Sequence, residues 1–206
     1  MEQENVNQLN KYILFIVIIY MISLPNEDLY LQLIHGLVDN GWKGSWNIKD
    51  NKIVISTGQT LIKRLENKPL DYHEALRLAI CIGINLASLT PLNKSILFLS
   101  FDDIYMIDED WYILSSFNKL VPIISKDIVM LTKPISFKEN LAPELKNVRS
   151  LPFKTNITAV YYSLASLIIE ALALENNLAP LAGSKLYYFL QRCLVINPEE
   201  RYFLFI

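Results

Sequence analysis

Cysteine, histidine and glycine are scarce in this sequence, and neither sign of charge dominates it. Among 206 residues there are two cysteines, two histidines and six glycines, and the net charge is −2. Because Cys81 and Cys193 both fall in apolar, helical patterns, we expect free buried thiols and a cytoplasmic location rather than a disulfide framework. The absence of a basic excess argues against a nucleic-acid partner, and a hydrophobic content of 52% argues against disorder.

The same scarcity argues against a metal centre, a bound cofactor or a catalytic residue. No histidine or cysteine accompanies the acidic residues at positions 102–110, and their spacing matches no EF-hand loop. His35 has no recognisable nucleophile or carboxylate partner, and His73 lies within a helix-capping pattern. The six glycines include no G-x-G-x-x-G phosphate-binding loop, and no V-A-I-K lysine is present. We therefore predict no metal ligands, no cofactor and no catalytic residues.

One long apolar run occurs, at residues 12–24 (YILFIVIIYMISL). As a helix it would extend about 20 Å, whereas a hydrocarbon core is roughly 30 Å thick. Glu2 and Glu4 precede it and no small-residue cleavage site follows it, so it makes a poor signal peptide. Its many β-branched residues favour a buried strand or helix, with a membrane-anchoring role as the alternative.

Residues 1–59 are predicted to be a short N-terminal extension, followed by a larger domain at residues 60–206. Two short apolar runs in the extension flank a turn at residues 49–51. This pattern predicts a β-hairpin at about residues 42–56. The extension is too short for a complete nucleotide-binding lobe.

Two stretches of the larger domain are apolar on almost every face. Asp71 and Glu74 match a capping box that starts the first helix, which continues through residues 75–89, and the second is predicted at residues 159–174. Such helices must be buried on several sides. The sequence therefore predicts a mainly α (α+β) fold with two buried central helices and small hairpins. Residues 121–140 show no clear period and are predicted to be an extended loop. Shorter helices are predicted at 60–66 and 186–194, and short strands at 96–99, 104–107 and 111–114.

Two motifs lie far apart in the larger domain: L-A-P-E at residues 141–144 and N-P-E-E-R at residues 197–201. A proline fixes the backbone close before each terminal charge. Apolar residues surround both. We predict that Glu144 and Arg201 form an ion pair that is at most partly exposed to water.

With Y-S-L at residues 162–164 and R-C-L at residues 192–194, these motifs resemble the lower lobe of the protein kinases. In that family the glutamate of A-P-E pairs with the arginine of N-P-x-x-R. The resemblance covers the chain from about residue 60 onward and implies a protein-kinase-like C-lobe. The nearest likeness is the kinase non-catalytic C-lobe domain, a protein-binding module that takes basic peptides into an acidic groove.

The positions of kinase chemistry carry other residues. The resemblance places Ser116 on the metal-binding aspartate of D-F-G and Val160 on the aspartate that anchors the catalytic loop. Residues 96–98 (I-L-F) fall on the H-R-D triplet, and Asp103 falls on the loop asparagine. Phosphoryl transfer needs these charged groups. The resemblance therefore implies a pseudokinase, a catalytically inactive interaction or scaffold module in signalling. The alternatives are a divergent or truncated protein kinase using ATP, and a membrane-tethered accessory protein.

Five acidic residues lie close together near the middle of the chain: Asp102, Asp103, Asp108, Glu109 and Asp110. The simpler interpretation is a solvated loop and hairpin turn. The alternative is an acidic docking surface, because like charges on one rim attract cations. The expected partner is then a protein that presents a basic peptide segment.

Overall fold

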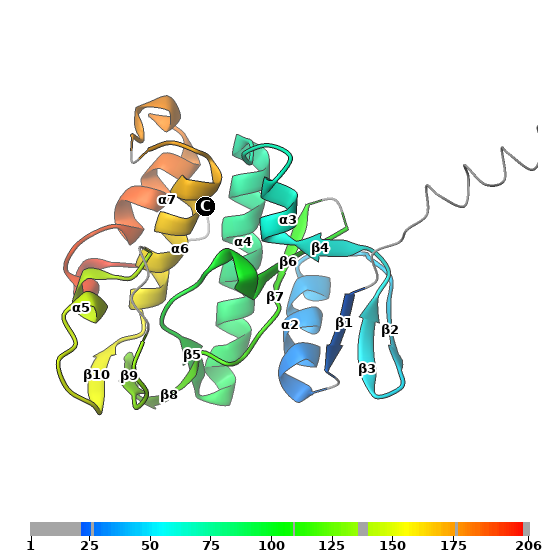
Figure 1. Cartoon of the computed structure of the whole chain (residues 1–206), viewed down its shortest axis with the longest axis horizontal. Coiled ribbons are helices and arrows are strands. Elements are labelled where there is room, and N and C mark those ends of the chain that lie inside the picture. Colours follow the sequence, from blue (N-terminus) through cyan, green and yellow to red (C-terminus); the bar gives the residue numbers. More distant parts are fainter. Residues whose placement is uncertain (1–21, 26, 109, 136–139, 176, 204–206) are drawn as a thin grey trace, which may run out of the picture.

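A computed structural model describes residues 22–25, 27–108, 110–135, 140–175 and 177–203 of the chain (Figure 1). These residues form an α+β fold that is 42% helical and 22% strand, with six α-helices and three antiparallel sheets. The expectation of a mainly α fold is therefore wrong. The expected kinase C-lobe is not confirmed.

The extra strand content lies in a segment that we expected to be a loop. Strands β8 (Leu120–Ser125) and β9 (Ile128–Leu131) form a hairpin. With β5 (Lys94–Ile96) and β10 (Phe153–Asn156), they make a four-stranded sheet in the order β10-β9-β8-β5. The loop prediction for residues 121–140 failed because Pro122 and a register shift after Ile123 interrupt the strand alternation. Residues 136–139 of that segment lie outside the described chain.

The N-terminal part forms a small sheet covered by a helix. Strands β1 (Ile22–Pro25), β2 (Trp46–Lys49) and β3 (Lys52–Ile55) pair in the order β1-β3-β2, and α2 (Asp28–Asp39) follows β1. The expected hairpin is present as β2 and β3, and both turn residues, Asp50 and Asn51, have positive φ. Of the apolar run 12–24, residues 12–21 lie outside the described chain, and the remainder belongs to β1.

The third sheet joins the N-terminal part to the rest. It contains β4 (Gly58–Thr60), β6 (Ile104–Ile107) and β7 (Trp111–Leu114) in the order β4-β6-β7. The boundary expected between residues 59 and 60 therefore falls inside a strand. In addition, the Tyr30 hydroxyl of α2 donates a hydrogen bond of 2.9 Å to the Ser115 carbonyl just after β7. The packing continues across that boundary.

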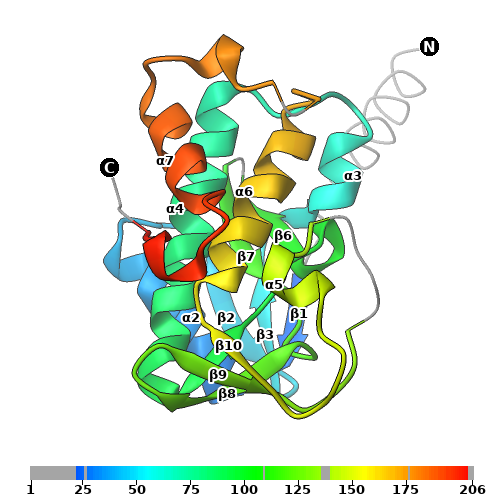
Figure 2. The same ribbon diagram turned by 90° about the vertical axis from the view of Figure 1, so that its left-hand side faces the viewer.

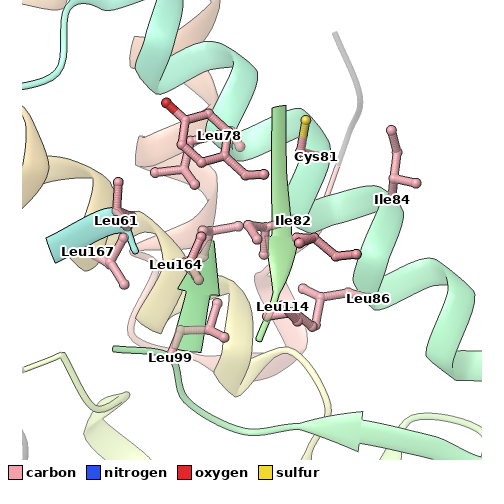
Figure 3. Packing of buried hydrophobic residues seen from close by; sticks show 14 of the residues in the cluster. Leu61, Leu78, Cys81, Ile82, Ile84, Leu86, Leu99, Leu114, Leu164 and Leu167 are labelled. Carbon is pink, nitrogen blue, oxygen red and sulfur yellow. The ribbon is translucent and has the colours of Figure 1, made fainter. Parts of the chain in front are cut away.

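The main core surrounds α4 (Tyr72–Leu89) and α6 (Ala159–Ala171). In Figure 1, α4 lies between α6 and α7 (Lys185–Cys193) on one side and α2 on the other. Figure 3 shows side chains of α3 (Leu61–Leu65), α4, β7 and α6 converging in this core. Cys81 and Cys193 are free and buried.

Asn85 is a buried polar residue of this core that is tied to the backbone. The Asn85 amide of α4 donates to the Cys81 carbonyl and accepts a 3.0 Å hydrogen bond from the Leu114 amide of β7. Among the described helices, the stretch Tyr72–Leu92 is the one that is long and apolar enough to cross a membrane, and half of it is buried inside the protein. A helix at the centre of a protein core is apolar on most faces for the same reason.

A second, smaller core lies beneath β8 and β9, beside the short helix α5 (Pro143–Lys146) (Figure 2). Its fully buried members share an aliphatic character: Leu97, Val121, Val129, Leu131, Leu141, Ala142, Leu145 and Ala159. We call these residues the small core.

Candidate interaction surface

An ion pair closes one side of the small core. Both guanidinium NH2 groups of Arg201 donate to the two carboxylate oxygens of Glu144, at 2.6 and 2.9 Å. The Arg201 side chain is fully buried, and that of Glu144 is 16% exposed. Arg201 also donates to the carbonyls of Val195 and Ile196 and lies 5.1 Å from the Tyr162 ring. This bidentate pair, which we call the clamp, joins α5 to the C-terminal segment.

The clamp lies where the two sequence motifs placed it. Pro143 opens α5 and Pro198 opens a short 3-10 turn, so each charge leaves a rigid piece of backbone. Each of the three guanidinium nitrogens of Arg201 donates to an acceptor, which offsets the cost of burying its charge.

The loop that precedes β6 is anchored from α6 by Ser163, a residue of the Y-S-L motif for which we predicted no anchoring role. The Ser163 hydroxyl accepts a 2.8 Å hydrogen bond from the Leu99 amide and donates to the Leu99 carbonyl at 3.4 Å. Val160, where the resemblance expects an anchoring aspartate, is an apolar core residue.

Asp103 is the one carboxylate at a position that the resemblance links to chemistry, and its charge is already neutralised. It forms an ion pair with Lys119 and accepts hydrogen bonds of 2.7 Å from the Ser100 amide and hydroxyl. Lys119 also donates to the Ser100 hydroxyl at 2.9 Å and lies over the Phe98 ring. All of these contacts to Asp103 are made at its Oδ2 atom.

The other positions of kinase chemistry offer no charge. Ser116 presents a hydroxyl, which accepts from the Asn118 amide at 3.3 Å. Ile96 and Leu97 are buried apolar residues, the first in the main core and the second in the small core. None of these side chains can act as a general base.

The described members of the predicted acidic docking surface, which we call the acidic rim, do not form one open face. Asp108 accepts hydrogen bonds of 2.6 Å from the Trp42 indole and the Thr57 hydroxyl, and its backbone has a positive φ. Asp110 pairs with Arg77 at 3.3 Å. Glu109 lies outside the described residues. The carboxylates of Asp108 and Asp110 therefore contact other side chains of this fold.

The position of β6 separates the members of the rim. Asp102 and Asp103 precede this strand and Asp108 follows it, so the two groups are roughly 15 Å apart along the strand. Of the four described acidic residues, Asp102 is exposed, Asp103 is buried, and Asp108 and Asp110 are partly buried. A separation beyond the Debye length of about 8 Å prevents them from acting as one field.

Two hollows lie on the surface of the small core. The first, of about 300 Å³, we call the β8 hollow, and the second, of about 420 Å³, the α5 hollow. They share Leu131, Pro134 and Ile135, which form a common wall. The β8 hollow is lined by Leu97, Phe98, Asn118, Lys119, Leu120, Val121, Pro122, Leu131, Thr132, Lys133, Pro134 and Ile135. The α5 hollow is lined by Leu131, Pro134, Ile135, Leu141, Leu145, Lys146, Val148, Arg149, Ser150 and Leu151.

The charged residues in these linings are all cationic. Lys119 and Lys133 line the β8 hollow, and Lys146 and Arg149 line the α5 hollow. No aspartate or glutamate appears among the described lining residues of either hollow. Lys119 is neutralised by Asp103, whereas Lys133, Lys146 and Arg149 are exposed and form no ion pair with the described residues.

Sequence reasoning missed this cationic surface. Its cations come from segments that we predicted to be a featureless loop or that follow the A-P-E motif, with apolar residues between them. The signal in the sequence is the mixture of lysines and aliphatic residues at 130–135 and 145–151. Nothing in that mixture indicates that the two segments meet.

No family model matches the chain, and no curated protein matches it. The likeness to protein kinases therefore depends on the motifs given above.

Proposed function

We propose that this protein is a catalytically inactive protein-binding module, without phosphotransfer activity, whose likeness to protein kinases is confined to its motifs. The observation that carries the proposal is the state of Asp103. This residue is the remaining carboxylate at a catalytic position, and Lys119 and Ser100 both bind its Oδ2 atom. A kinase needs such groups free to meet Mg²⁺ and the phosphates.

A binding role is supported by the surface next to this position. The small core carries two hollows with apolar floors, in the size range of ligand sites. The clamp and the four-stranded sheet hold that surface in place. A hollowed and partly apolar surface is a feature of docking sites.

Mg-ATP titration tests the absence of kinase chemistry. In a thermal-unfolding assay of the full chain, we expect no increase in the unfolding midpoint. A ligand at 100 times its Kd would add about 2.7 kcal/mol to the free energy of unfolding, which is readily measured. A clear increase with Mg-ATP would favour the truncated or divergent kinase instead.

Selection from a random peptide library on the folded chain tests the binding role. We expect enriched peptides that bind the folded chain and lose binding when the chain is unfolded. A library that returns no binder to the folded chain would overturn the proposal of a peptide-binding module. The membrane-tethered alternative predicts instead that the full chain needs detergent for extraction.

A further inference from the structure

Three exposed cations, which form no ion pair with described residues, and the two hollows occupy the same part of the surface. Lys133 lines the β8 hollow, and Lys146 and Arg149 line the α5 hollow on the other side of the common wall. The whole chain has a net charge of −2, so this cationic surface runs against the overall charge. Exposed cations that form no ion pair within the described part of the chain favour an anionic partner.

The hollows determine the shape of that partner. Their floors are the aliphatic side chains of the small core, including Leu131, Leu141 and Leu145. An apolar floor that is concave accepts a protruding apolar side chain. A flat lipid surface cannot enter such a hollow. Leu151, at the margin of the α5 hollow, is 39% exposed and would be covered by an inserted side chain.

We infer that the β8 and α5 hollows bind a short peptide segment of a partner protein, rich in carboxylates and carrying apolar side chains between them. The apolar side chains fill the two hollows on either side of Pro134. The carboxylates meet Lys133, Lys146 and Arg149, the last of which can hold a carboxylate through two parallel hydrogen bonds. This inference rests on the proposed function. It predicts an acidic partner peptide, whereas the acidic rim predicted a basic one.

Fluorescence anisotropy with a defined probe tests this inference. The probe is a short fluorescein-labelled peptide in which leucines alternate with pairs of glutamates. We expect it to bind the full chain, and to bind less tightly as salt is added because exposed charges are screened. Replacing its glutamates by glutamine or its leucines by serine should each weaken binding, because both kinds of contact are required.

Two variants with equal charge change locate the site. The site variant carries Lys133→Gln, Lys146→Gln and Arg149→Gln, and we expect about a tenfold weaker Kd, which corresponds to about 1.4 kcal/mol. The control carries Lys43→Gln, Lys49→Gln and Lys52→Gln, three exposed lysines at the β2–β3 hairpin on the opposite side of the molecule (Figure 1). We expect the control to bind like the wild type, with unchanged thermal unfolding in both variants.

The outcomes separate the inference from the proposed function. Equal weakening in the two variants would show a general charge effect and overturn the site. A probe that fails to bind, while library-selected peptides do bind, would refute the acidic partner and leave the binding module standing. Binding of vesicles that contain phosphatidylserine, lost in the site variant, would assign the cations to a membrane and also refute the peptide.

Discussion

The main core around α4 and the small core beneath β9 consist of similar aliphatic residues but are closed in different ways. The main core is enclosed mainly by helices that are apolar on most faces, and it borders one hollow of about 210 Å³. The small core has a sheet on one side and the Glu144–Arg201 ion pair beside it, and two larger hollows lie on its surface. Under the proposed function, the main core supports the fold and the hollowed surface of the small core receives the partner.

Truncating one leucine in each region tests that difference most directly. We expect Leu164→Ala, at a fully buried site in α6, to lower the free energy of unfolding by about 4–5 kcal/mol. Leu131→Ala should cost about 2–3 kcal/mol, because Leu131 borders two hollows and the loss adds less new cavity. Urea unfolding monitored by circular dichroism measures both. Equal losses would mean that the small core is packed as tightly as the main one.

The clamp should be the most sensitive polar contact of the small core. Glu144→Ala leaves the buried Arg201 charge without its carboxylate, and we expect a loss of about 3–5 kcal/mol. Glu199→Ala is the matched control, since it removes the same charge from an exposed site in the N-P-E-E-R motif. The comparison uses the midpoints of urea unfolding. If both variants unfold at the same midpoint, the clamp does not hold the small core closed.

The exposed Asp71 cap of α4 should contribute less to the free energy of unfolding than the clamp does, and its contribution should depend on pH. Asp71 caps α4, and a hydrogen bond from the Glu74 amide lowers the pKa of the Asp71 carboxyl below its ordinary value of 3.8. A lowered folded-state pKa contributes stability above pH 3.8 that is lost as the pH falls through the folded value. We expect Asp71→Ala to cost about 1 kcal/mol at neutral pH.

Measurements at acid pH distinguish the contribution of the Asp71 charge from that of its hydrogen bond. In thermal unfolding at a series of pH values, the deficit of Asp71→Ala should shrink at acid pH. Asp71→Asn keeps an acceptor that does not titrate, so it should stay close to the wild type at neutral pH. A deficit of Asp71→Ala that is the same at every pH would show that ionisation of the cap is irrelevant.

Thiol labelling gives the smallest signal but reports on the main core alone. Burial raises the pKa values of both Cys81 and Cys193 to about 12, so almost no thiolate exists at neutral pH. We expect negligible reaction with a thiol reagent in the native chain and complete reaction after unfolding. Leu164→Ala should accelerate labelling by loosening the main core, whereas Leu131→Ala should not. Acceleration by both variants would indicate that the two cores open together.

Several features could be predicted because they depend on neighbours in the chain or on rigid local motifs. The capping box at Asp71 and the β2–β3 hairpin arise from residues a few positions apart. The two apolar helices follow from composition alone, because helices of that kind need burial. The charges of Glu144 and Arg201 are far apart in sequence, yet each follows a proline that sets its backbone.

Other features were decided by the tertiary structure. The β8–β9 hairpin depends on pairing with β5 and β10, and its interrupted alternation left no local signal. The charge of Asp103 is neutralised by Lys119, sixteen positions away and brought near by the fold. The cationic hollows exist because residues 131–135 lie between β8 and α5, which is a matter of chain path. Periodicity and capping report on local backbone preference, whereas a surface is made by segments that meet only after folding.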